Sequence, residues 1–151
     1  MNPSPAVPPN PVARTAVVSL ETVEGAGMRF GARIGDHALT LDTGPGAAGP
    51  SPIDVVLAAL GGCTAMDVIS ILRKQRQQVT GYDVVVTGER RMDAHPKVYT
   101  RIEVVHRVRG RDLRPAAVEE AVRLSETRYC AVHAMLSPTV PVTTRFEIVP
   151  E

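Results

Sequence analysis

Residues 51–73, SPIDVVLAALGGCTAMDVISILR, decide the fold of this chain. The stretch opens with helix-start chemistry: Ser51 can cap a helix, Pro52 suits its first position, and Asp54 completes a capping box. Apolar residues then recur on nearly every face, which is typical of a helix inside a protein. Two aspartates and a glycine pair interrupt the run, so we expect a buried core helix rather than a membrane span.

Gly61 and Gly62 directly precede Cys63 in the middle of this helix. Each glycine costs a helix interior about 1 kcal/mol relative to alanine. The pair therefore indicates that another backbone, or a substrate, comes close at this point. We expect the short helix that carries the second cysteine, Cys130, to pack into the notch that the glycines leave.

Composition limits the classes of function. The chain has 151 residues, which fits one domain with a substantial core. Its 17 basic and 16 acidic residues leave a net charge of +1, so neither nucleic acid nor a membrane surface is an expected partner. Aromatic residues make up only 3% of the chain, which argues against base stacking on aromatic platforms.

Two cysteines are too few for a disulfide-rich secreted framework, and no signal-peptide pattern is visible. We therefore expect a cytoplasmic protein. In that compartment a cysteine pair is more often redox-active or metal-binding than structural.

The rest of the chain predicts strands and two further helices. Residues 1–12 are proline-rich and predict a flexible tail, followed by a single domain over residues 13–151. We expect a helix from a cap at Asp112, with Pro115 in its first turn, and then a further turn of helix over residues 128–136. Strands are predicted at residues 14–23, 28–34, 37–41, 82–90, 98–109 and 140–149.

The predicted strand 98–109 has the clearest pattern. Ile102, Val104, His106 and Val108 alternate with Arg101, Glu103, Val105 and Arg107, which predicts one buried and one wet face. The order of strands, long helix, strands, helices and strand indicates an α+β fold with antiparallel sheets. One sheet covers only one side of so apolar a helix, so we expect a homodimer in which a second copy of the helix covers another side.

The cysteines Cys63 and Cys130 permit three interpretations. They could be buried small hydrophobes, a redox pair, or, together with His133, ligands of a zinc ion. Three ligands are one short of a structural zinc site, so we expect neither a metal nor another cofactor. Asp67, which is unusual on so apolar a helix, is expected to act as a cap or to pair with a buried polar group.

The stretch SPIDVVLAALGGCTAMDV and the later RYCAVHAML resemble the OsmC/Ohr family of thiol-dependent hydroperoxide reductases. The similarity extends over nearly everything after the tail. It implies an intertwined homodimer in which sheets enclose two long central helices. It also implies that Cys63 is the peroxidatic cysteine and Cys130 the resolving one.

The resemblance further implies that charged groups activate the thiol. Family peroxidases hold the thiolate with an arginine from the N-terminal half, for which Arg29 and Arg33 are the candidates here. They also have a glutamate ten residues before the reactive cysteine, where this chain has Ile53, with Asp54 one step further on. A free thiol has a pKa near 8.5, so a cationic partner is needed for reaction at neutral pH.

From these features we expect a peroxidase that reduces organic hydroperoxides and is regenerated by an external dithiol. The apolar surroundings of Cys63 favour an organic substrate. The alternative is a protein of the same fold that binds a small hydrophobic ligand and has little or no peroxidase activity, which Ile53 favours.

Overall fold

The computed structural model describes residues 12–21, 25 and 27–151. The predicted tail over residues 1–12 therefore lies outside the described residues, except for its last position. The chain separates into two compact units, residues 1–52 and residues 53–151. Each unit is described by itself, and the prediction of a single domain over residues 13–151 stays a prediction.

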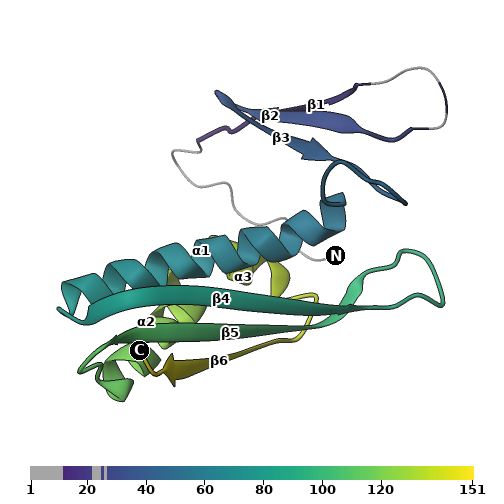
Figure 1. The fold of residues 1–151 in the computed structure, drawn as a ribbon. Helices are drawn as coiled ribbons and strands as arrows, with labels where there is room; N and C mark the ends of the chain where they lie inside the picture. Colours follow the sequence, from purple (N-terminus) through teal and green to yellow (C-terminus); the bar gives the residue numbers. More distant parts are fainter. Residues whose placement is uncertain (1–11, 22–24, 26) are drawn as a thin grey trace. The chain divides into compact units, whose positions relative to one another are not determined.

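The N-terminal unit contains a three-stranded antiparallel sheet in the order β1-β2-β3 (Figure 1). Its strands are β1 (Ala16–Leu20), β2 (Phe30–Ile34) and β3 (His37–Leu41), shorter than predicted at the first two. The turn between β2 and β3 contains Gly35 at φ 60°, a backbone conformation that glycine adopts at little cost. One cavity of about 320 Å³ in this unit is lined mainly by apolar side chains: Val18, Met28, Phe30, Leu41, Asp42, Thr43 and Pro52.

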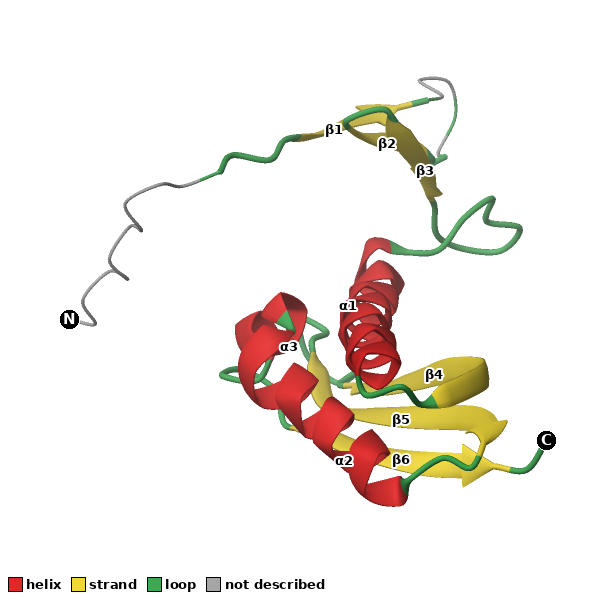
Figure 2. Cartoon of the chain, turned by 90° about the vertical axis from the view of Figure 1, so that its left-hand side faces the viewer, coloured by secondary structure: helices red, strands yellow, loops and turns green. Residues whose placement is uncertain are grey.

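The C-terminal unit is one layer of helices on one face of a second sheet, as Figure 2 shows. The sheet has the order β4-β5-β6, formed by β4 (Gln78–Arg90), β5 (Tyr99–Arg111) and β6 (Val142–Val149). The helices are α1 (Pro52–Lys74), α2 (Pro115–Leu124) and α3 (Ala131–Leu136), with a π-helical turn, η1 (Ser125–Tyr129), between α2 and α3. The predicted α+β class is confirmed, but β6 runs parallel to β5 rather than antiparallel.

One stripe of α1 is buried. Leu60, Thr64, Val68 and Leu72 recur every four residues, and all four are buried. Other sides of the helix are uncovered within the single chain, since Met66 is 74% exposed. The expected burial on every side is thus not met by one chain. By length and apolar composition alone, α1 is the one helix in the described residues that could cross a membrane.

The pattern of β5 is as predicted at its inward positions. Ile102, Val104, His106 and Val108 are all at most 2% exposed. Val105 was expected on the wet face, and this prediction is wrong, because it is also buried. Its direct neighbours on the flanking strands are Val85 and Arg145, and the aliphatic stem of an arginine can cover an apolar neighbour.

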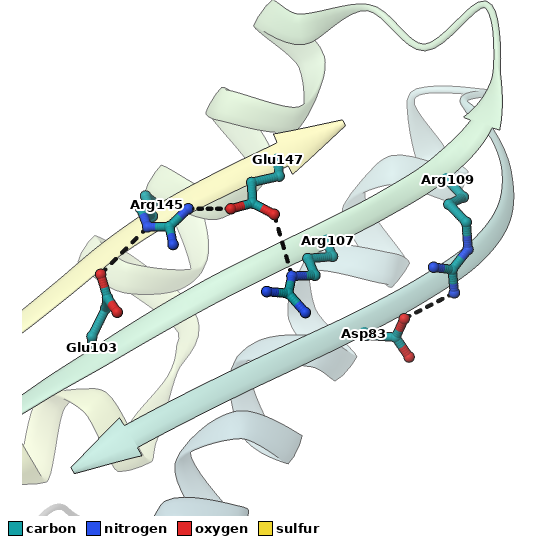
Figure 3. Close-up of polar contacts among 6 residues, drawn as sticks. All are labelled: Asp83, Glu103, Arg107, Arg109, Arg145 and Glu147. Carbon is teal, nitrogen blue, oxygen red and sulfur yellow. Dashed lines mark hydrogen bonds and ion pairs between the residues drawn. The ribbon is translucent and has the colours of Figure 1, made fainter. Parts of the chain in front are cut away.

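The outer face of this sheet is charged. Arg145 pairs with Glu103 and Glu147, Glu147 also pairs with Arg107, and Arg109 pairs with Asp83, as Figure 3 shows. These side chains are substantially exposed. The outer face is therefore mainly charged and exposed, with Val105 as a buried exception, whereas α1 and α2 pack on the inner face.

The start of α2 differs from the prediction. Asp112 does not cap the helix: its backbone has φ 46°, and Arg114 occupies the N-cap position without a side-chain cap. The side chain of Gln77 instead accepts a hydrogen bond from the Arg114 backbone N–H, at 3.0 Å. A group from a distant segment thus satisfies this donor, which local sequence could not indicate.

Candidate thiol site

Cys63 and Asp67 lie on the same face of α1. Residues four apart on a helix are neighbours on its surface, so the long helix presents a thiol and a carboxylate together. Cys63 is half-buried and packs against the apolar cluster formed by Leu60, Tyr99, Ile102, Val104, Cys130 and Val140.

Cys130 lies between two helical segments, not inside a helix. The predicted turn of helix over residues 128–136 is confirmed at 131–136, but it is wrong at Cys130, because η1 ends at Tyr129 and α3 begins at Ala131. Cys130 is extended, with φ −73° and ψ 102°, and it is the N-cap of α3. Its sulfur accepts a hydrogen bond from the His133 backbone N–H at 3.3 Å. The break positions a thiol that is only 2% exposed.

These elements bring three donor atoms together. The sulfurs of Cys63 and Cys130 and a carboxylate oxygen of Asp67 all lie within 4.8 Å of one another. Burial raises the pKa of the Cys130 thiol to about 11; Cys63 and Asp67 act in the same direction, and the His133 N–H opposes them. Two thiols and a carboxylate in contact are groups that can undergo thiol redox chemistry or hold a cation.

Hydrogen bonds fix the position of the Asp67 carboxylate. The hydroxyl of Ser125, which is fully buried in η1, donates to Asp67 Oδ2 at 3.0 Å. Since a serine hydroxyl has one proton, the Thr64 hydroxyl, 2.8 Å away, is then the donor to Ser125. The expectation that Asp67 pairs with a buried polar group is confirmed. This chain of bonds also ties α1 to η1.

Another polar pair joins the fully buried His106, on the inner face of the sheet, to the half-buried Tyr82. The hydroxyl of Tyr82 is 2.6 Å from Nδ1 of His106, and the two rings are stacked. Burial lowers the pKa of His106 to about 4, and burial together with the Asp67 charge raises that of Tyr82. His106 is therefore a neutral, hydrogen-bonded core residue.

The other charged candidates lie in or beside β2 and in the first turn of α1. Arg29 forms an ion pair with Asp42 at 3.6 Å, and Arg33 lies exposed on β2, so both belong to the N-terminal unit. Asp54 is exposed in the first turn of α1 and contributes to a raised pKa at Tyr99. An activating role for any of the three stays a prediction.

His133 does not complete the zinc set that the sequence offered. Its ring nitrogen Nε2 lies 3.5 Å from Glu126, and its backbone, not its ring, contacts Cys130. Within the described residues, the third donor beside the two thiols is Asp67. Sequence reasoning missed Asp67 and Ser125 as parts of the site, although the four-residue spacing from Cys63 to Asp67 could have indicated the first.

The glycine pair accommodates a different neighbour from the one expected. A Cβ at Gly61 would lie 3.0 Å from the Val86 side chain, so the absence of a side chain at Gly61 lets α1 pack closely against β4. A Cβ at Gly62 would meet nothing within 4 Å. The prediction that the Cys130 segment packs into a Gly61–Gly62 notch is therefore wrong. A cavity of about 280 Å³ lies here, lined by Leu57, Ala58, Gly61, Gly62, Val84 and Val86.

Fold and site together define an α+β protein with a thiol pair at its long core helix. The model of the OsmC-like protein family matches residues 44–145, and the chain belongs to this family. The match includes α1, which is thus the core helix of the family's fold and does not indicate a membrane protein.

Three known proteins illustrate the similarity. Protein YhfA of Escherichia coli K12 is 46% identical over 113 residues, which are 75% of this chain and 84% of YhfA. A hypothetical protein from Aquifex aeolicus is 28% identical in its crystal structure, with TM-score 0.81 over 93% of this chain and 98% of that one. The organic hydroperoxide resistance protein OhrB of Bacillus subtilis is 16% identical, with TM-score 0.60 over 90% and 98%, and shares the fold. Membership of this family suggests a redox or peroxide-related role.

Proposed function

We propose that this protein reduces organic hydroperoxides through Cys63 and Cys130. The observation that carries the proposal is the approach of the two sulfurs to within 4.8 Å of each other. A sulfenic acid formed on one cysteine would find its reaction partner in the same chain. The name of OhrB, an organic hydroperoxide resistance protein with the same fold, supports this direction.

The reaction has two steps at the protein. The Cys63 thiolate attacks the terminal peroxide oxygen, the O–O bond breaks, and the departing alkoxide takes a proton to become an alcohol. Cys63 is then a sulfenic acid. The Cys130 sulfur displaces its hydroxyl, which leaves as water with the Cys130 proton, and a Cys63–Cys130 disulfide forms. An external dithiol supplies the two electrons and two protons that restore both thiols.

The surroundings favour an organic substrate over hydrogen peroxide. Cys63 packs against apolar side chains, and Gly62 beside it faces open space. An alkyl or aryl group gains from leaving water at such a surface, by about 25 cal/mol for each Å² buried. Hydrogen peroxide has no apolar group that could gain free energy from burial at this surface.

The proposal includes a cationic partner for the thiolate and a second copy of the chain. Arg29 or Arg33 is the proposed cation.

The uncovered sides of α1, which include the exposed Met66, support an intertwined homodimer. A cytoplasmic location is part of the proposal too. Sedimentation equilibrium should find two chains per particle at micromolar concentration, and a monomer would contradict the dimer.

A second candidate function is the binding of a small hydrophobic ligand. A cavity of about 330 Å³ is lined by Ile53, Val56, Val98, Tyr99, Ile102, Leu136, Thr139 and Val140. This volume lies within the range of small-molecule sites. Ile53, where family peroxidases have a glutamate, makes this wall apolar.

A steady-state assay with cumene hydroperoxide and a dithiol separates the two functions. We expect thiol-dependent turnover in the wild type and in Asp83→Asn, a control on the outer face of the sheet. Cys63→Ser should lose turnover by at least about a thousandfold, since it removes the nucleophile. Absence of turnover in the wild type, or full activity in Cys63→Ser, would leave only the binding function.

A further inference from the structure

We propose that Cys63 and Cys130, when reduced, form together with Asp67 a binding site for a thiophilic divalent cation such as Zn²⁺. The bound cation prevents the two thiols from reacting with peroxide. The metal site itself is independent of the proposed peroxidase function. The proposed inhibition by the bound cation rests on that function, because it requires that the same two sulfurs react with peroxide.

The geometry meets the first requirement of a metal site. The three donor atoms already lie within 4.8 Å of one another. Tetrahedral zinc holds thiolate sulfur at about 2.3 Å and carboxylate oxygen at about 2.0–2.2 Å, which places the donors roughly 3.5–3.8 Å apart. Binding needs a contraction of about 1 Å. The side chains of the two cysteines turn towards the carboxylate, which keeps its hydrogen bond to Ser125, and water takes the fourth position.

The carboxylate also has the support that metal ligands require. Ser125 donates its hydroxyl to Asp67 Oδ2, and Thr64 in turn lies 2.8 Å from Ser125. Such outer hydrogen bonds orient a ligating carboxylate and commonly matter by 10–100-fold in affinity. The second oxygen of Asp67 is then the one that binds the cation.

A path for the cation reaches the ligand set. A cavity of about 350 Å³ is lined by Asp67, Ser70, Ile71, Lys74, Leu124 and Tyr129. Tyr129 at its wall is half exposed, so the cavity communicates with solvent. Asp67 is the member of the ligand set that lines this cavity.

Charge favours a cation, and the donor type selects it. With both thiols ionised, the three donors Cys63, Asp67 and Cys130 carry negative charge, which Lys74 at the cavity wall opposes only in part. A divalent cation balances such a set. On binding, each thiol releases its proton to solvent, so two protons leave for each ion taken up. Soft thiolate donors select Zn²⁺ over Mg²⁺ or Ca²⁺.

The consequence for reactivity is mutual exclusion. A thiolate that donates its electron pair to zinc is not available to attack a peroxide oxygen. Conversely, a Cys63–Cys130 disulfide has lost both thiolate donors and cannot hold the ion. The site would therefore be loaded only in the reduced protein.

Cobalt titration of the reduced full-length protein tests the site directly. Tetrahedral thiolate–Co²⁺ has a near-ultraviolet charge-transfer band and visible d–d bands. We expect both bands, saturating at one ion per chain, abolished by Zn²⁺ but not by Mg²⁺. Alkylation of the two thiols in the wild type should abolish them without any substitution.

Matched variants test the ligand set. Asp67→Asn should weaken Co²⁺ binding at least about tenfold, whereas Asp83→Asn on the outer face and His133→Ala should leave it unchanged. Circular dichroism verifies that each variant is folded. Absence of the charge-transfer band in the wild type, or binding lost in His133→Ala and kept in Asp67→Asn, would overturn the proposed site.

Turnover measured with and without equimolar Zn²⁺ separates this inference from the proposed function. We expect zinc to suppress turnover in the wild type. A charge-transfer band without any thiol-dependent turnover would contradict the peroxidase and leave the metal site standing. Peroxidase turnover that proceeds unchanged in saturating zinc would overturn the proposed inhibition by the bound cation.

Discussion

The two faces of the sheet β4-β5-β6 carry polar side chains in opposite ways. On the outer face, arginines and carboxylates pair in the open, as between Arg145 and Glu103 (Figure 3). Against the inner face, a few polar groups are buried and bonded to each other, as in the pairs Ser125–Asp67 and Tyr82–His106. Exposed pairs contribute little to stability, whereas a buried group left without its partner costs about 1–3 kcal/mol. Burial, more than the number of contacts, therefore decides how much a polar group contributes to the free energy of unfolding.

His106 should give the largest effect on stability. Burial holds its pKa at about 4 in the folded chain, against 6.5 in the absence of burial. Between these pH values the unfolded chain binds the proton more strongly than the folded one. Stability is therefore fully present above pH 6.5 and falls as the pH drops towards 4, by about 3 kcal/mol.

Urea unfolding at pH 7 and pH 4 measures this effect. His106→Gln should lose about 3 kcal/mol less between the two pH values than the wild type does. His37→Gln, at an exposed position of β3, should retain the wild-type dependence. If all three proteins lost the same stability on acidification, His106 would not be the buried neutral group described here.

Ser125 should give the next largest effect. Ser125→Ala leaves the buried Thr64 hydroxyl and the Asp67 carboxylate without a shared partner, so we expect a loss of about 1–3 kcal/mol in the free energy of unfolding. Thr127→Ala, two residues away on the exposed side of η1, should change it by at most about 0.5 kcal/mol. Equal losses in urea unfolding would show that the inner network has no special weight.

Arg145 should give the smallest effect, although it has two carboxylate partners. Arg145→Gln should shift the urea midpoint less than Ser125→Ala does. The residual shift should vanish at about 1 M salt, where the screening length is about 3 Å. A larger shift than that of Ser125→Ala, persisting in high salt, would reverse the ranking of the two faces.

The sequence predicted the elements that depend on local pattern. The cap chemistry at Ser51 and Pro52 lies within one residue of the observed start of α1 at Pro52. The period-two alternation in β5 identified Ile102 and its inward neighbours. These features arise from interactions between residues near in sequence, or from a single hydrophobic face.

The sequence did not predict features that depend on distant partners. Gly61 is adjacent to Val86 of β4, and Gln77 bonds the start of α2. The break at Cys130 follows a π-helical turn, which no local pattern announced. The parallel pairing of β6 depends on where the chain returns after α3. Of the site, both cysteines were identified. Asp67 was missed although it lies one helical turn from Cys63, and Ser125 of η1 reaches Asp67 only in the folded chain.

The central claim is that Cys63 and Cys130 act as one redox pair. Mass spectrometry of the reduced protein, treated with one equivalent of cumene hydroperoxide and digested, tests it most directly. We expect a Cys63–Cys130 disulfide within one chain, no remaining free thiol, and full reversal by a dithiol. In Cys130→Ser, excess peroxide should carry Cys63 on to the sulfinic acid, a gain of two oxygens on its peptide. If Cys63 instead stays unmodified in both proteins, the two cysteines are core residues and the claim is wrong.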